Sequence, residues 1–234
     1  RFIVATTGLD DKSALFSLNK KQKHPFRALL PVPEGVGGRF SFASPVGMFF
    51  LAMTTDTRRE TIAQRVHDAM RGLADAEVAS YTDPLSPENI GYMLATVNVL
   101  AAQKRKPNIV FYPYAKILKL LGEWYTQLST ESLQERGEGQ NVIATCGPTG
   151  NHSILNGIIN GPRDKIIHFI QVEHYPDEKD YTVPKGVDIG GGLDVLEGKR
   201  LGSIQNASYL GTAHNFTQSG VLNTTIRIPA INTY

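Results

Sequence analysis

The segment Gly37-Gly38-Arg39-Phe40-Ser41 combines two glycines with a permanently charged side chain. Glycine lets the backbone approach a ligand closely and adopt positive φ angles, although it costs conformational entropy. The guanidinium of Arg39 is planar and suits oxyanions, because it stabilises negative charge without giving up a proton. An ordinary loop with a surface arginine is the alternative. We expect Gly38 and Arg39 to lie against an anionic part of a substrate.

The stretch 124–132 places an amide and a carboxylate one helical turn apart. Gln127 and Glu131 are separated by four residues, so they project from the same face of a continuing helix. Glu131 lies near the end of an apolar helix, where the helix dipole disfavours an anion. A solvated glutamate at a helix end explains the pattern without chemistry. The other interpretation is a carboxylate base, for which proximity to the substrate replaces basicity.

A histidine closely follows a predicted strand, in the segment 145–153. Thr149 or Asn151 is positioned to cap a helix that runs to about Asn160. In the first turn of such a helix the dipole disfavours the imidazolium form, so His152 is suited to exchange protons near neutral pH. A histidine of the capping region without chemistry is the alternative.

Two of these segments resemble signatures of the glucose-6-phosphate isomerases. The Gly-Gly-Arg-[Phe/Tyr]-Ser signature of that family matches residues 37–41 position for position. The family's Gln-x-x-x-Glu-Ser context matches Gln127 and Glu131-Ser132. A Gly-Lys pair usually follows in the family, whereas the stretch 133–137 is longer and lacks the lysine.

The third segment resembles another element of the same family, Gly-x-x-[Gly/Asp]-Gln-His-Ser. It keeps His152-Ser153, while Asn151 replaces the usual glutamine. The following stretch 161–165 looks like the compact bacterial and archaeal branch of these isomerases. The resemblance therefore runs through nearly the whole chain.

The resemblance implies a role for each candidate residue. Glu131 moves the proton between C2 and C1 of the sugar, Arg39 stabilises the enediolate, His152 opens the sugar ring, and Gly38 and Gln127 bind the substrate. The implied reaction interconverts glucose 6-phosphate and fructose 6-phosphate, and it needs no redox cofactor and no metal. The family also implies a homodimer with shared active sites, in which His152 serves the partner's site while Arg39 and Glu131 serve their own.

The elements that must position these residues alternate between strand and helix. Helical periodicity appears over about 58–73, over about 87–103 with Ser86 as N-cap and Pro87 as first residue, and over 117–128. The long stretch 176–192 contains charges, a proline and three successive glycines, and it predicts a loop. Short apolar runs predict strands at 2–5, 28–32, 108–112, 142–146, 165–172 and 224–228.

This alternation predicts an α/β fold with a mostly parallel sheet and helices on both faces. Ligands of such sheets bind beyond the carboxyl ends of the strands, so we expect the candidate segments at that edge. The resemblance implies three-layer lobes of the sugar-isomerase (SIS) type. Residues 1–55 are expected to form the C-terminal part of a first lobe, with the Arg39 loop. Residues 56–234 are expected to form a second lobe without its C-terminal helices.

The composition excludes several classes of protein. The 234 residues are 41% hydrophobic and 20% charged, which is ordinary for a globular protein with a core. A net charge of +2 without a basic cluster argues against nucleic acid as a partner. The basic run 20–23 is expected to be a solvated helix end, and no apolar stretch approaches the roughly 18 residues of a membrane span. The single cysteine, Cys146, is expected to be a small buried hydrophobe and fits a cytoplasmic protein.

Both ends of the chain have the appearance of cuts within a longer protein, because strand-like runs lie at Arg1 and just before Tyr234. By the resemblance, a phosphate-gripping loop would precede the chain and a ring-opening lysine would follow it. We therefore expect the isolated chain to show little activity. Two alternatives stay open: the isomerase part of a larger enzyme (a transaldolase fusion or a phosphoglucose/phosphomannose isomerase), and a sugar-phosphate sensor of the same fold without catalysis.

Overall fold

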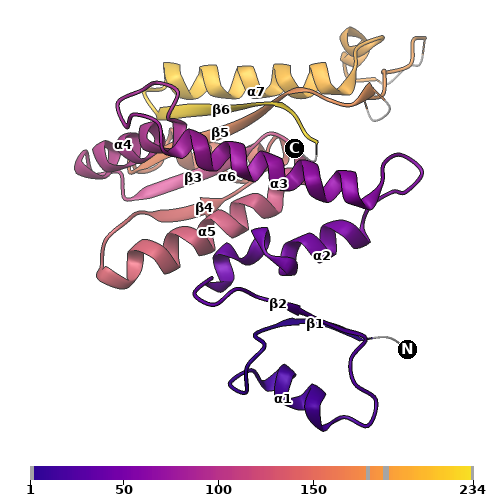
Figure 1. Ribbon diagram of the computed structural model, residues 1–234. Helices are drawn as coiled ribbons and strands as arrows, with labels where there is room; N and C mark the ends of the chain where they lie inside the picture. The colour runs from indigo at the N-terminus through magenta and orange to yellow at the C-terminus, as the bar shows by residue number, and fades with distance from the viewer. Residues whose placement is uncertain (1–2, 178–179, 187–189, 233–234) are drawn as a thin grey trace. The chain divides into compact units, whose positions relative to one another are not determined.

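The computed structural model describes residues 3–177, 180–186 and 190–232. They form two compact units, one ending at Asn89 and the other spanning Ile90–Asn232 (Figure 1). Each unit has a parallel sheet of its own, with two strands in the first unit and four in the second.

The first unit begins with a parallel strand pair, β1 (Val4–Thr7) and β2 (Ala28–Pro31), which confirms both early strands. Phe2, the first residue of the predicted strand, lies outside the described residues. Helix α1 (Ala14–Lys21) connects the strands and begins at Ser13, whose hydroxyl accepts a hydrogen bond from Phe16 N at 3.2 Å. Because α1 ends at Lys21, the basic run lies at an exposed helix end, as predicted.

The Arg39 segment lies in a short 3-10 helix, η1 (Gly38–Ala43), that leads directly into α2 (Pro45–Met53). Ser44 caps α2, because its hydroxyl accepts a hydrogen bond from Val46 N at 3.2 Å. Gly47 permits this tight entry: a Cβ at that position would lie 2.0 Å from the Phe42 carbonyl oxygen. Any larger residue at Gly47 would push η1 and α2 apart.

Helix α3 (Ile62–Ser80) belongs to the first unit, where it packs on α2. It begins at Thr61, whose hydroxyl accepts a hydrogen bond from Gln64 N at 3.1 Å. The boundary between the two units therefore lies after Asn89, whereas the sequence indicated a domain boundary near Asp56. The two positions differ because α3 packs on α2 and belongs to the first unit. The assignment of the chain to two sugar-isomerase lobes stays a prediction.

The second unit is built on four parallel strands in the order β4-β3-β5-β6. They are β3 (Asn108–Pro113), β4 (Asn141–Ala144), β5 (Lys165–His174) and β6 (Leu222–Ala230). All four predicted strands are confirmed, with ends shifted by a few residues. Four helices surround this sheet: α4 (Ile90–Gln103), α5 (Lys119–Leu133), α6 (Thr149–Ile159) and α7 (Leu201–Gln218).

Successive residues of β3 bury opposite faces of the sheet, as the period of two in a strand requires. Ile109 packs with Ala101 of α4 on one face, where Tyr125 of α5 also stacks on Phe111. Tyr112 packs on the other face, against α6 and α7. The fully buried Phe169 centres that second core, with ring centroids 5.5 Å from Tyr112, 5.5 Å from Tyr209 and 5.7 Å from Phe216. The result is a three-layer α/β unit (Figure 1).

Three helices differ from the sequence-based expectations, and one of them, α2, was not predicted. Helix α4 begins at Ile90, so Ser86 and Pro87 do not start it. Instead the Ser86 hydroxyl accepts a hydrogen bond from Glu88 N within a turn. Helix α7 was not predicted at all, because its buried face includes Gly202 and Thr212 and shows no apolar stripe.

The described part of the stretch 176–192 contains no α-helix and no strand, in line with the predicted loop, and Thr182 forms an isolated bridge with Arg200. Residues 178–179 and 187–189 of that stretch lie outside the described residues. The three glycines 190–192 adopt φ angles of 67°, 62° and 73°, which favour glycine. Among the described helices, none has the length and apolar character needed to cross a membrane.

Candidate active site

Arg39 lies half-buried in η1, where its guanidinium carbon stands 4.7 Å above the ring of Phe40. The two glycines before it do not use positive φ: Gly37 is extended at φ −63°, and Gly38 lies outside the left-handed region. A Cβ added at Gly38 would meet no described atom within 4 Å. Packing within the chain therefore gives no reason for glycine at Gly38, and close approach to a ligand stays a prediction.

Gln127 and Glu131 lie on one exposed face of α5, as their spacing predicts. The Gln127 side-chain amide donates a hydrogen bond from Nε2 to Oε1 of Glu131 at 2.9 Å. This contact restricts the orientation of the carboxylate and keeps it at the surface of the last helical turns. The structure thus brings together a substrate-binding candidate and the proposed base.

The position of Glu131 relative to the sheet corrects one expectation. Helix α5 leaves the carboxyl end of β3 and returns to the start of β4, which runs parallel to β3. Its last turn therefore lies at the amino edge of the sheet, and not at the carboxyl edge where the segment was expected (Figure 1). Glu131 is 12 residues beyond Lys119, or about 18 Å along the helix axis.

His152 lies at the carboxyl edge, as expected, because β4 leads directly into the first turn of α6. The imidazole is exposed and makes no hydrogen bond or ion pair with any described residue. The predicted caps are wrong: Pro148 precedes the helix without a side-chain cap, and Thr149 and Asn151 are already helical. Pro148 fits this place because its fixed φ starts a helix and its missing N–H loses no bond there.

Asn151 instead fixes the first turn of α6 to the core. Its Oδ1 accepts a hydrogen bond from the Tyr112 hydroxyl and lies 2.9 Å from the Tyr114 hydroxyl, while its Nδ2 donates to Thr212 Oγ1 at 3.0 Å. Burial, more than the neighbouring Tyr114, raises the pKa of Tyr112 well above its ordinary value, so its hydroxyl stays a donor. The residue beside His152 is therefore held by partners on β3 and α7, and the imidazole faces outward.

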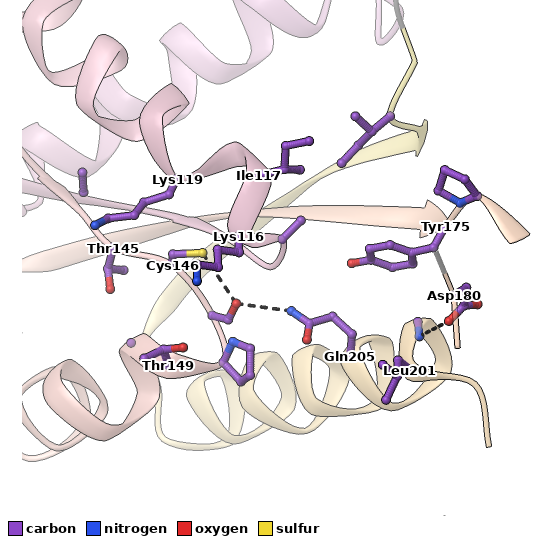
Figure 2. A pocket seen from close by; sticks show the side chains of 18 of the residues that line it. Lys116, Ile117, Lys119, Thr145, Cys146, Thr149, Tyr175, Asp180, Leu201 and Gln205 are labelled. Carbon is purple, nitrogen blue, oxygen red and sulfur yellow. Dashed lines mark hydrogen bonds between the residues drawn. The ribbon is translucent and has the colours of Figure 1, made fainter. Parts of the chain in front are cut away.

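A cavity of about 820 Å³ opens at the same carboxyl edge (Figure 2). Its walls come from the segments after β3, β4 and β5 and from the start of α7. Lys116, Lys119 and Gln205 line it, and none of them was predicted. The signal was available for the lysines, since they follow the buried strand β3 closely. Gln205 belongs to the helix that the sequence did not reveal.

Cys146 also lines this cavity and is half-buried. Burial raises the pKa of its thiol, and the charges of Lys119 and Lys116 oppose that effect only in part. The thiol is therefore mostly protonated at neutral pH, in keeping with the expectation of a packing residue and not a nucleophile.

His168 of β5 is fully buried and is part of the packed interior. Its Nδ1 lies 2.6 Å from Thr224 Oγ1 and its Nε2 lies 2.7 Å from Asn98 Oδ1. The Asn98 oxygen can only accept, so Nε2 carries the proton and Nδ1 accepts from the threonine hydroxyl. Burial lowers the pKa of His168 from 6.5 to about 4, which keeps the ring neutral.

Comparison with known proteins identifies homologues of the chain. No family model matches the chain. A probable glucose-6-phosphate isomerase from Haloquadratum walsbyi is 32% identical over 229 residues, which cover 98% of this chain and 49% of that relative. A glucose-6-phosphate isomerase from Rubrobacter xylanophilus is 31% identical over 204 residues, covering 87% of this chain and 44% of that relative. The chain is homologous to glucose-6-phosphate isomerases.

Solved structures support the same fold for this isomerase homologue. A hypothetical protein from Thermus thermophilus matches with a TM-score of 0.79 at 25% identity, covering 99% of this chain and 52% of that one. A glucose-6-phosphate isomerase from Chlamydia trachomatis matches with a TM-score of 0.70 at 16% identity, covering 98% of this chain and 44% of that one, which shows the fold alone. The predicted α/β fold is confirmed. The chain spans about half the length of the isomerases that it matches.

Proposed function

We propose that the chain carries catalytic residues of an aldose–ketose isomerase that interconverts glucose 6-phosphate and fructose 6-phosphate. Homology to glucose-6-phosphate isomerases over 98% of the chain is the observation that carries the proposal. The reaction moves a proton between adjacent carbons through an enediolate. It needs a base, a fixed positive charge beside the developing oxyanion, and a group that opens the cyclic sugar.

Glu131 is the proposed base, taking the proton from C2 and returning it to C1. Its exposed position on α5 leaves room for a substrate, and the 2.9 Å hydrogen bond from Gln127 orients the carboxylate beforehand. A base fixed within reach of the carbon gains in rate from proximity, so it need not be strongly basic. Gln127 is proposed to contact the substrate beside it.

Arg39 is the proposed cation beside the enediolate oxygen. Its guanidinium keeps its charge throughout the reaction, and the ring of Phe40 beneath it restricts its motion. The open space where a Gly38 side chain would stand lets the backbone and the sugar come close. Electrostatic stabilisation of this kind is commonly among the largest contributions to catalysis.

His152 is proposed to open the sugar ring in the site of a partner subunit. On one chain Glu131 lies at the amino edge of the sheet and His152 at the carboxyl edge, on helices that cover opposite faces. A single sugar cannot lie within hydrogen-bond reach of both. We therefore propose a homodimer with shared sites, acting on a sugar phosphate in the cytoplasm.

The test is Glu131→Gln in the native protein, with isomerisation and glucose 6-phosphate binding both measured. Loss of a general base is expected to lower turnover by about 10²–10⁴-fold, with binding changed only a few-fold. Glu135→Gln, a nearby exposed carboxylate on η3 (Gln134–Arg136), is the matched control and should keep full turnover. Unchanged turnover in Glu131→Gln would contradict the role of Glu131 as the base. A native protein that binds sugar phosphate without isomerising it would contradict the proposed activity and favour a sensor.

A further inference from the structure

The cavity at the carboxyl edge of the second unit has the dimensions and position of a small-molecule site. Its volume of about 820 Å³ lies within the range of roughly 300–1,000 Å³ that is usual for such sites. It also lies at the topological switch of the sheet: β3 and β5 are neighbours, but their following helices lead to opposite sides, toward β4 and β6. Ligands of open parallel sheets bind in the crevice at that point.

This cavity is separate from the proposed base of the isomerase. Glu131 lies at the opposite edge of the sheet, and the residues that line the cavity include Ser153 but not His152. The isomerase reaction proposed above therefore assigns no ligand to this cavity.

One side of the cavity is basic. Lys116 in η2 (Lys116–Leu118) and Lys119 at the start of α5 both line it, and Figure 2 shows them beside Cys146 and Thr145. Within the described residues, neither lysine forms an ion pair. Two ammonium groups on one wall without carboxylate partners create a positive field that attracts an anion.

Neutral donors stand on the same side. Thr145 and Thr149 line the cavity, and neither hydroxyl forms a hydrogen bond within the described residues. Gly150 is required here because a Cβ would lie 2.3 Å from Thr145 Oγ1. Helix α6 begins at Thr149, so the positive end of its dipole adds to the lysine charges.

The opposite side is polar but electrically balanced. Asp180 lines it, yet its Oδ1 accepts a hydrogen bond from Gly202 N at 2.6 Å and its Oδ2 lies 2.9 Å from Arg200 Nε. Gln205 donates to the Tyr114 and Gly147 carbonyl oxygens at 2.9 and 3.2 Å, which leaves its own Oε1 as an acceptor toward the cavity. The charged group of a ligand would thus face the lysines, and its neutral donor groups would face Gln205.

We propose that this cavity binds a small phosphate-bearing anion, with the phosphate held by Lys116, Lys119 and the hydroxyls of Thr145 and Thr149. Two ammonium groups match the double charge of a phosphomonoester, and the hydroxyl donors match its additional oxygens. A monocarboxylate would leave one lysine unpaired. The site is additional to the isomerase site and does not depend on that activity.

Cys146 offers a local probe, because it lines the cavity and its alkylation can be followed by peptide mass spectrometry. The native protein is treated with iodoacetamide at about pH 8.5, where more of the thiol is ionised. The rate is compared in inorganic phosphate, glucose 6-phosphate, glucose, and potassium chloride of equal ionic strength. We expect both phosphate compounds to slow alkylation at least fivefold, and glucose and chloride to have no effect.

The double variant K116M/K119M should lose this protection, so that its rates with and without phosphate agree within a factor of two. Lys104→Met is the matched control, because Lys104 is an exposed lysine just after α4 at the amino edge, and it should keep the protection. His152→Asn should also keep it. Absence of protection, equal protection in K116M/K119M, or loss of protection in His152→Asn overturns the proposal, and none of these results depends on isomerase activity.

Discussion

Mixing two inactive variants tests whether each active site is built from two subunits. Helices α5 and α6 both start at the carboxyl edge of the sheet. Glu131 is nine residues further from the start of its helix than His152 is from the start of its own, so the two residues are about 13 Å apart in the strand direction. They also lie on opposite faces of the sheet. Proton transfer requires contact at about 3 Å, which one sugar cannot make with both residues of one chain. Glu131→Gln and His152→Asn should each lower turnover by about 10²–10⁴-fold as homodimers.

A heterodimer of the two variants contains one site with both mutations and one site with neither. Random pairing of equal amounts makes half of the dimers mixed, so activity should return to about one quarter of the wild-type value in a twofold dimer. Co-expression with two different affinity tags allows the mixed dimer to be isolated, and it should then show half of wild-type turnover. A purified heterodimer as inactive as both parents would refute a site shared between subunits, and with it the roles of these two residues.

Two further predictions concern the second unit. Burial lowers the pKa of His168 from 6.5 to about 4, so the imidazole of the unfolded chain binds a proton at a higher pH than that of the folded chain. The free energy of unfolding should therefore fall by about 3 kcal/mol as the pH is lowered from 6.5 to 4. Urea denaturation at several pH values measures this dependence of the free energy of unfolding on pH, and His168→Gln should weaken it. An unchanged pH dependence in His168→Gln would contradict the lowered pKa of His168. A Cβ at Gly147 would lie 2.4 Å from the ring of the buried Tyr114, so Gly147→Ala should lower the free energy of unfolding by about 1–3 kcal/mol. Gly157 has open space around it within α6, so Gly157→Ala should raise the free energy of unfolding by about 0.5–1 kcal/mol. Equal denaturation midpoints for the two alanine variants would show that Gly147 is not needed for packing.

The strands of this protein are readable from its sequence because the parallel sheet is covered on both faces. Runs such as Ile109–Tyr112 and Ile166–Ile170 are continuously apolar, with the single exception of His168, and they signal a strand without any knowledge of neighbours. Helix α7 gives no such signal. Thr212 is buried and hydrogen-bonded to Tyr114, which directly follows β3, and to Asn151 of α6, so its polarity hides the buried face of the helix.

The candidate residues were chosen by their types and spacing, which also predicted the edge of the sheet for His152 but not for Glu131. The spacing of Gln127 and Glu131 predicts their contact, since helical geometry is local. The edge of the sheet at which Glu131 lies depends on the full length of α5, and the residue types alone do not determine where that helix ends. The pair Lys116 and Lys119 resembles any solvated helix start until the topology brings Thr145 and Gln205 to the same cavity.

The fate of the hydrogen on C2 tests the central claim, that Glu131 carries this proton to C1. Glucose 6-phosphate deuterated at C2 is converted by the native protein, and the label in fructose 6-phosphate is read by NMR and mass spectrometry. The account predicts that part of the deuterium appears at C1 and the rest is lost to solvent, and that Glu131→Gln abolishes both processes. Complete retention of the label would indicate a hydride shift, and undiminished transfer by Glu131→Gln would show that another group is the base.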